Sequence, residues 1–337
     1  MDNKVNEFLA IKGLKNRLKW INDNLEDTQL LYILKIVKLK LNATVHGNTL
    51  LYIAIKNHGD DSLPGNNNNL KAITLLINAG ADPNIHADLS PLMMTQISPQ
   101  GWATQRPDNT IITQLLIDAG ANINAKNIST ALFLALQYRN IDSINLLLQN
   151  GADPNIPCEY NETPLQYALR FLQVNLVKTL LRNGADPNLS LGSAPTPLCI
   201  AMKNNNIDNI ELLLQNGADP NKPSGRLTPL YLALIMKYSR QVLEILLKAG
   251  ANPNIPTKIT PYFNASTTIK DMYDVTPLQY AIKNGMSEIV ELFEQSVNSF
   301  GKSIKRTSVD INLKNASVDI KYLLSLNEFW CIKRKVF

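Results

Sequence analysis

Cysteine is scarce in this 337-residue sequence. The three cysteines, Cys158, Cys199 and Cys331, are odd in number, far apart and without CxxC spacing. Neither a disulfide framework nor a zinc site is therefore expected, and a reducing, cytosol-like compartment fits best. We expect Cys199 to be a small buried thiol and Cys158 to be an exposed, unreactive one.

Histidine and the common catalytic motifs are also rare or missing. The three histidines all lie in the first third of the chain, so a cysteine–histidine pair would have to join distant segments. No P-loop, GxGxxG, HExxH or GxSxG sequence occurs. The adjacent carboxylates Asp60 and Asp61 lie in a polar segment, which favours solvation over acid–base chemistry. We predict no catalytic residue, no metal and no cofactor, and a minor enzymatic activity in the two ends of the chain is the alternative.

Long apolar runs are absent as well. The first residues mix charged with apolar side chains, and Leu30 to Leu41 is interrupted by Lys35, Lys38 and Lys40. Neither a secretory signal nor stable membrane insertion is expected from this pattern. Hydrophobic residues still make up 45% of the chain at a mean hydropathy of -0.10, which is typical of a soluble folded protein.

The net charge of +5 is concentrated in one region. After Gly301, basic residues outnumber Asp310, Asp319 and Glu328. They are Lys302, Lys305, Arg306, Lys314, Lys321, Lys333, Arg334 and Lys335. The rest of the chain is therefore near neutral, which argues against the long basic face that nucleic-acid binding requires.

Two blocks recur in phase along the chain. The first, Gly-Ala-Asp/Asn-x-Asn, begins at Gly80, Gly120, Gly151, Gly184, Gly217 and Gly250. The second, Thr-Pro-Leu-x-x-Ala, begins at Thr163, Thr196, Thr228 and Thr276, with weaker copies at Thr49, Ser90 and Thr130. From Gly151 onward the four glycines of this block are separated by three equal steps of 33 residues (184−151, 217−184 and 250−217).

Each block has a structural reason. Threonine followed by proline favours a helix start, because the hydroxyl caps free amides and proline needs no partner at the first helical position. A second helix with a wide apolar face follows, as in Asn209 to Leu214, and the glycine after it permits a left-handed helix end. One such unit cannot bury its own apolar stripe, so several must stack.

The linked blocks and the 33-residue step resemble the ankyrin repeat. The resemblance implies an all-α solenoid of about seven helix-turn-helix repeats with extended fingers. On this basis the chain divides into an N-terminal helical cap at 1–44, an ankyrin-repeat array at 45–297 and a basic C-terminal extension at 298–337. It also implies a monomeric adaptor that binds a partner protein on its concave surface, without nucleic acid.

The sequence departs from the family pattern in two ways. The usual histidine after Thr-Pro-Leu is replaced, so the hydrogen bond that it provides between fingers must be substituted or lost. The replacements are Tyr52, Phe133, Gln166, Cys199, Tyr231 and Gln279. Polar insertions at 58–69 and 98–109 are expected to be surface loops, and 255–275 lengthens a finger.

The ends of the chain lack the blocks. Residues 5 to 44 carry two helical patterns, one from Phe8 to Ile21 and one from Asp27 to Leu41, which favours a helical cap on the first repeat. The C-terminal extension becomes apolar at Tyr322-Leu323-Leu324 and at Phe329-Trp330. We expect it to form a short helix that docks on the last repeat.

Ankyrin proteins bind partners through their fingertips and the two helix positions beyond Thr-Pro-Leu-x-x-Ala-x. Carried onto this chain, the candidates are the helix residues Gln137, Tyr138, Arg170, Phe171, Lys203, Asn204, Ile235, Met236 and Lys283, and the finger residues Lys126, Glu159, Tyr160 and Tyr273. Aromatic and arginine side chains dominate protein interfaces, so the expected hot spots are Tyr138, Tyr160, Arg170, Phe171 and Met236. For Phe171, Ile235 and Met236 the alternative is packing against neighbouring helices.

Two further hypotheses concern cellular role. The asparagine-rich repeats resemble those of host-directed effectors of intracellular bacteria or large viruses, which implies a host protein as partner and a location in the cytoplasm or, after delivery, in a host cytosol. The alternative rests on Lys333-Arg334-Lys335 beside Phe329, Trp330 and Phe337, a set suited to anionic lipid or to nuclear import.

Overall fold

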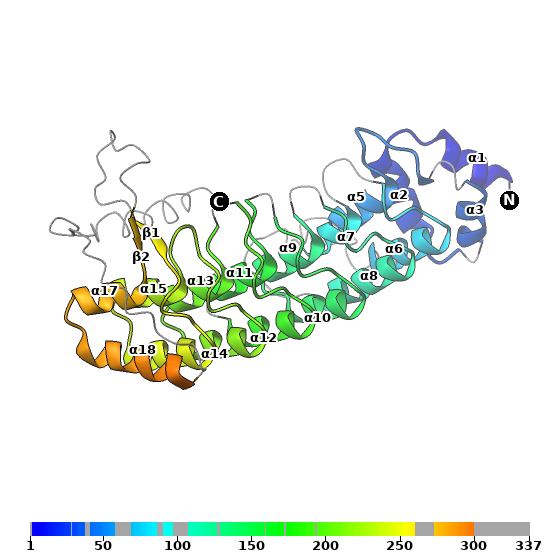
Figure 1. Ribbon diagram of the computed structural model, residues 1–337. Coiled ribbons are helices and arrows are strands. Elements are labelled where there is room, and N and C mark those ends of the chain that lie inside the picture. The colour runs from blue at the N-terminus through cyan, green and yellow to red at the C-terminus, as the bar shows by residue number, and fades with distance from the viewer. Residues whose placement is uncertain are drawn as a thin grey trace, which may run out of the picture. The chain divides into compact units, whose positions relative to one another are not determined.

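The computed structural model describes residues 2–27, 29–37, 41–57, 69–85, 90–96, 107–126, 129–158, 160–171, 173–192, 194–259 and 273–299 (Figure 1). Its contacts divide the chain into two compact units, Met1–Leu191 (unit 1) and Gly192–Phe337 (unit 2). The loops predicted at 58–69 and 98–109 lie outside the described residues except for their last positions. The predictions for the extension beyond Ser299 also lie outside them.

Unit 1 begins with three helices and continues with four helix pairs. The three helices are α1 (Asp2–Ala10), α2 (Leu14–Asp23) and α3 (Leu30–Ile36). The pairs are α5 (Leu50–Asn57) with α6 (Asn69–Asn78), α7 (Pro91–Met94) with α8 (Pro107–Asp118), α9 (Ala131–Gln137) with α10 (Ile141–Gln149), and α11 (Pro164–Arg170) with α12 (Val174–Arg182). Each first helix packs against the next one, from α5 to α7, α9 and α11. The fingers leave from the side of these first helices (Figure 1).

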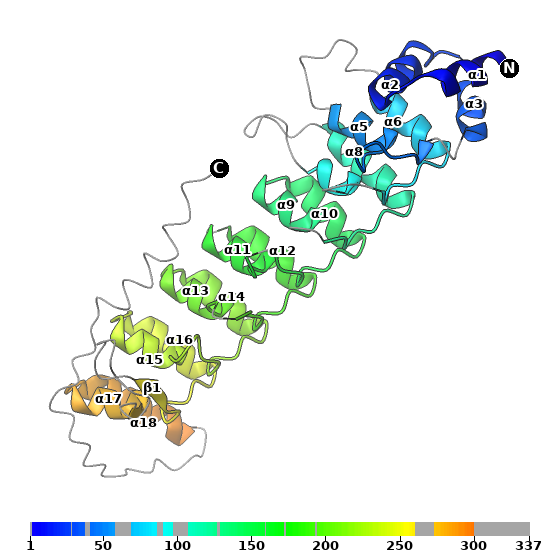
Figure 2. The same cartoon turned by 90° about the horizontal axis from the view of Figure 1, so that it is seen from above.

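Unit 2 contains three more pairs. They are α13 (Pro197–Lys203) with α14 (Ile207–Gln215), α15 (Pro229–Ile235) with α16 (Arg240–Lys248), and α17 (Pro277–Lys283) with α18 (Ser287–Ser299). Helix α15 packs between α13 and α17, and α16 packs against α18 (Figure 2). The described residues thus hold seven helix pairs, which confirms the predicted helical array.

Every first helix begins with a side-chain cap. The side-chain oxygen of the residue before the helix accepts a hydrogen bond from the backbone N–H three residues later, at Thr49, Ser90, Thr130, Thr163, Thr196, Thr228 and Thr276. Such a cap is worth about 1 kcal/mol. At Thr163 and Thr276 the side chain of Gln166 or Gln279 also accepts from the threonine N–H, at 2.9 Å in both cases. These glutamines, which stand where the family has histidine, therefore complete the helix cap.

Asparagine side chains join neighbouring fingers. Asn155 donates from Nδ2 to the carbonyl of Gly184 at 2.9 Å, and its Oδ1 accepts from the N–H of Asp186 at 2.7 Å. The same two bonds, here called asparagine staples, are made by Asn84 and Asn124 in unit 1 and by Asn221 in unit 2. Fingers within each unit are thus connected without the histidine of the family pattern.

The three N-terminal helices pack on the first pair, through contacts of α2 with α5 and α6 and of α3 with α6. Gly13 adopts a φ of 85°, which only glycine tolerates easily, and it separates α1 from α2. The single helix expected from Phe8 to Ile21 is therefore two helices.

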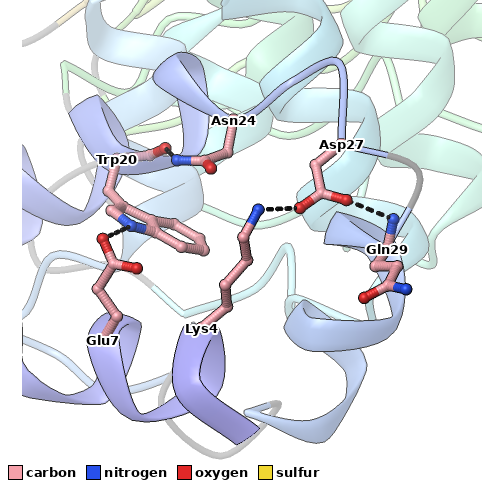
Figure 3. Close-up of polar contacts among 6 residues, drawn as sticks. All are labelled: Lys4, Glu7, Trp20, Asn24, Asp27 and Gln29. Carbon is pink, nitrogen blue, oxygen red and sulfur yellow. Dashed lines mark hydrogen bonds and ion pairs between the residues drawn. The ribbon is translucent and has the colours of Figure 1, made fainter. Parts of the chain in front are cut away.

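Polar contacts tie these N-terminal helices together (Figure 3). The Lys4 ammonium pairs with Asp27 at 2.5 Å, and Trp20 Nε1 donates to Glu7 Oε1 at 2.8 Å. The hydrogen bond from Lys4 is the main reason why the pKa of Asp27 is below its ordinary value. The ion pair and the tryptophan bond join residues 23 and 13 positions apart, so they hold the helices against one another.

The long finger before α17 contains the sheet of unit 2. Strands β1 (Thr257–Ile259) and β2 (Tyr273–Val275) pair antiparallel, with Thr257 opposite Val275. The sequence predicted a longer finger here but no strands. The hairpin places Val275 immediately before the cap of α17.

Candidate protein-binding surface

Three aromatic rings form a connected row in unit 1. Phe133 on α9 meets Tyr167 on α11 edge-on, with ring centroids 5.2 Å apart, and Tyr167 lies 4.5 Å from Phe171 at the end of α11. Phe133 is buried, whereas Tyr167 and Phe171 are partly exposed. Edge-to-face and tilted ring contacts favour defined orientations. The buried ring of Phe133 therefore supports the partly exposed ring of Tyr167, which in turn contacts Phe171.

Arg170 lies beside this row on the same helix. Its guanidinium carbon is 6.0 Å from the ring centroid of Phe171, and its guanidinium forms an ion pair with Glu162. The Glu162 side chain is 14% exposed and that of Arg170 is 37% exposed. Because the carboxylate is largely shielded from water, solvent and salt screen this ion pair less than they screen a pair on the surface. Glu162 thus positions Arg170 at the edge of the aromatic row.

The finger that carries Glu162 ends in a tight turn. The N–H of Cys158 donates to the carbonyl of Glu162 at 3.0 Å, and the N–H of Asn161 donates to the carbonyl of Cys158 at 3.1 Å. Asn161 has a φ of 56°, a left-handed conformation that asparagine tolerates better than most residues. The turn leaves Tyr160 at its tip, 70% exposed.

Cys158 is buried in this turn, so the prediction of an exposed thiol is wrong. The turn folds over it, and only 6% of the residue is exposed. Burial raises the pKa of the Cys158 thiol, while the Tyr160 N–H and the positive charges of Arg170 and Lys126 act more weakly in the opposite direction. A thiol with a raised pKa stays protonated at neutral pH.

Cys199 is buried at the start of α13, which confirms its predicted role as a small buried thiol. Burial raises its pKa as well, against the weaker effects of hydrogen bonds with Thr196 and Ser224.

Gln137 and Tyr138 occupy the equivalent place one repeat earlier. Both follow the Ala135 of the second block, at the end of α9, and both are exposed, Tyr138 to 40%. Tyr138 stands at the repeat position of Phe171, and Gln137 at that of Arg170. The same face of two consecutive repeats in unit 1 therefore offers large side chains to solvent.

In the α15 repeat of unit 2 the equivalent positions behave differently. Ile235 is 6% exposed and packs with Tyr231 and Val275, and Met236 packs against the same cluster. The prediction that Ile235 lies on an exposed binding face is wrong, and the alternative of packing is confirmed for it. The reason is the hairpin, which brings Val275 over α15. Met236 is only partly exposed for the same reason.

The remaining candidates are scattered. Lys203 and Lys283 are exposed at the ends of α13 and α17, and Asn204 is partly buried. Tyr273 lies in β2, but its side chain, like Glu159, is outside the described residues.

Sequence reasoning missed Glu162, Tyr167 and the contact of Tyr167 with Phe133. The family pattern pointed to the two positions after each second block. Glu162 instead precedes a block, and Phe133 and Tyr167 lie within blocks. The available signal was the aromatic side chains inside consecutive blocks, Phe133 in one and Tyr167 in the next, offset by one position.

The described part of the chain offers little other chemistry. It contains no cluster of three histidine, cysteine or carboxylate side chains placed to hold a metal ion. Among the helices described, none has the length and apolar character needed to cross a bilayer. What the geometry of unit 1 provides is a fixed set of aromatic and charged side chains open to solvent.

Comparison with known families matches the chain to a family model. A family model described as ankyrin repeats (3 copies) matches residues 62–157, 101–191 and 173–257. The three overlapping matches together extend from residue 62 to residue 257, which is more than half of the chain. No curated protein matches the sequence.

Proposed function

Because the chain belongs to the ankyrin-repeat family, whose repeats generally act as protein–protein interaction modules, we propose that unit 1 binds a partner protein through its finger side. The contact surface is formed by the residues at the ends of α9 and α11 and at the fingertip between them. These are Tyr138, Tyr160, Arg170 and Phe171, here called the aromatic surface.

The observation that carries this proposal is the exposure of two tyrosines in consecutive repeats, together with an arginine that is paired with Glu162. Tyr138 and Tyr160 are 40% and 70% exposed, although tyrosine side chains gain from burial. Arg170 is held by Glu162 and by the ring of Phe171. Tyrosine and arginine are enriched among the residues that contribute most to protein interfaces. A surface that is fixed before binding loses little conformational entropy on binding.

The resemblance of the asparagine-rich repeats to host-directed effectors supports a host protein as the partner. A cytosolic location follows from that hypothesis. The chemistry of the aromatic surface specifies a partner face with apolar pockets and acceptor groups for Arg170.

Affinity capture with matched variants tests the proposal. The variant Tyr138→Ala with Arg170→Ala removes two members of the aromatic surface, and Lys203→Ala with Lys283→Ala removes two exposed residues at equivalent positions in unit 2. We expect the first to lower the affinity for the captured partner about tenfold or more, and the second to leave it unchanged. A chain ending at Ser299 separates binding by the C-terminal extension from binding by the surface. Equal affinity of the wild type and the first variant would refute the proposal.

A further inference from the structure

The last helix pair of unit 2 leaves an apolar position uncovered. The residue after the alanine of the second block is buried in the preceding repeats of both units, with exposures of 0% for Leu136, Leu169 and Met202 and 2% for Leu234. In the last repeat this residue is Ile282, and it is 57% exposed. Within a unit the next helix pair covers this position, as α11 does after α9, α15 after α13 and α17 after α15. No described helix follows α18.

The second helix of this pair is open in the same way. Ile289 and Val290 are only partly buried, whereas Val242 and Leu243, their equivalents in α16, are 1% and 2% exposed. Ile282, Ile289 and Val290 together form the open end of unit 2. An apolar set of this kind is stabilised by anything that removes it from water, at roughly 25 cal/mol per Å².

The helix that borders the open end, α18, is acidic, and its Glu288 lies 3.9 Å from Arg240 of α16. Helix α18 carries Glu288, Glu291 and Glu294 and no lysine or arginine. Glu294 stands at the repeat position of Leu247, which is 3% exposed in α16. A segment that fits this end should therefore be apolar on one side and basic at its margins.

The chain itself contains such a segment beyond the described residues. Ile320-Lys321-Tyr322-Leu323-Leu324 has the same spacing as Val177-Lys178-Thr179-Leu180-Leu181 in α12, where Val177 and Leu180 are fully buried against their neighbours. The sequence after Gly301 has eight basic and three acidic residues, which gives it the charge opposite to α18. Nineteen residue steps separate Ser299 from Val318, and an extended chain of that length spans about 60 Å. The segment can therefore reach the end face of the pair it follows.

We propose that residues 318–326 of this chain cover the open end of unit 2. Ile320, Leu323 and Leu324 pack on Ile282, Ile289 and Val290, and the basic residues of the extension face the glutamates of α18. The segment takes the place of the second helix of an eighth repeat. This inference is independent of the aromatic surface, which lies in unit 1.

Hydrogen exchange of the full chain, followed by mass spectrometry, tests the proposal. Leu323→Asp with Leu324→Asp should make the backbone amides of α17 and α18 exchange about tenfold faster, because the cover is lost. Leu313→Asp adds a charge to the same extension outside the repeated spacing, and it should leave exchange unchanged. Random-coil exchange of residues 318–326 in the wild type, or no response of α17 and α18 to the double variant, would overturn the proposal.

A reciprocal variant and a mass measurement complete the test. Ile282→Asp should accelerate exchange of residues 318–326 without affecting α13, because Ile282 is exposed enough for the repeat to remain folded. Sedimentation velocity should give a mass that does not change with concentration. Protection of α17 and α18 that appears only as a dimer forms would show that a second copy, and not the chain's own extension, covers the end.

Discussion

The same position of the repeat serves opposite purposes in the α9 repeat of unit 1 and in the α15 repeat of unit 2. In unit 1 the residues just beyond the second block, such as Gln137 and Tyr138, face solvent. In unit 2 Ile235 at that position is packed under Val275, which the hairpin of the long finger supplies. The difference shows that repeat position alone does not decide whether a side chain is available to a partner. The length and structure of the adjacent finger decide it.

The largest effect on stability is expected when Ile235 and Gln137, which share a repeat position, are each replaced by alanine. Ile235→Ala should lower the free energy of unfolding by about 2–4 kcal/mol, because it leaves a cavity beneath the hairpin. Gln137→Ala, in unit 1, should change it by no more than about 0.5 kcal/mol. Urea denaturation followed by circular dichroism measures both. Similar small effects would mean that the hairpin does not bury Ile235 in solution.

The asparagine staples should instead behave alike in the two units. Asn155→Ala in unit 1 and Asn221→Ala in unit 2 each remove two hydrogen bonds between fingers, and we expect each to lower the free energy of unfolding by about 1–2 kcal/mol. Asn145→Ala, on the exposed face of α10, is the matched control and should have little effect. A large difference between the two staple variants would show that the fingers of one unit are held by other contacts.

Alkaline pH should weaken unit 2 through a partly buried phenol. Burial, with a smaller effect of Cys199, raises the pKa of Tyr238 from 10.0 to about 12. Because the unfolded phenol ionises first, the stabilisation is complete below pH 10 and is lost as the pH rises toward 12. Tyr238→Phe should therefore reduce the loss of unfolding free energy between pH 8 and pH 11 by about 1 kcal/mol.

The control for this experiment is Tyr138→Phe in unit 1, which retains Tyr238. It should keep the full alkaline loss seen in the wild type. Both variants are compared by urea denaturation at the two pH values, and identical pH dependence of Tyr238→Phe and wild type would contradict the assignment.

The smallest expected effect concerns the turn between the two helices of a pair. Arg139 in unit 1 and Lys237 in unit 2 have φ values of 55° and 54°, where the last repeat has Gly285 at 65°. Glycine adopts this conformation without steric cost, so Arg139→Gly and Lys237→Gly should each raise the free energy of unfolding by about 0.5–1 kcal/mol. Gly285→Ala should lower it. Thermal unfolding of the three variants shows whether the turns of the two units are equivalent.

Most of the fold could be predicted because its determinants are local. A threonine or serine before each first helix and a glycine after the second are sufficient to place a helix pair, and the 33-residue step implies the stacking. The hairpin could not be predicted, because each strand has three residues and the intervening segment carries no alternating pattern. The break between α1 and α2 at Gly13 could not be predicted either, because the apolar periodicity continues from Phe8 to Ile21 across this glycine.

The candidate surface was predicted less completely. Family positions identified Tyr138, Tyr160 and Arg170, all of which are exposed in the structure. The pair of Arg170 with Glu162 and the contact of Phe133 with Tyr167 depend on side-chain directions in neighbouring repeats, which spacing does not specify. Burial of Cys158 follows from the turn that folds over it, and a fingertip position in the sequence gives no sign of that turn.

The asparagine staples have a consequence for how such a protein changes over generations. Each asparagine staple is formed by residues of two adjacent fingers and by no residue farther away. Duplication or deletion of one whole repeat in the gene should therefore leave each asparagine staple with its donor and its acceptor. The number of repeats can therefore change while the hydrogen bonds between neighbouring fingers stay the same. Exposed side chains can also change without loss of these hydrogen bonds.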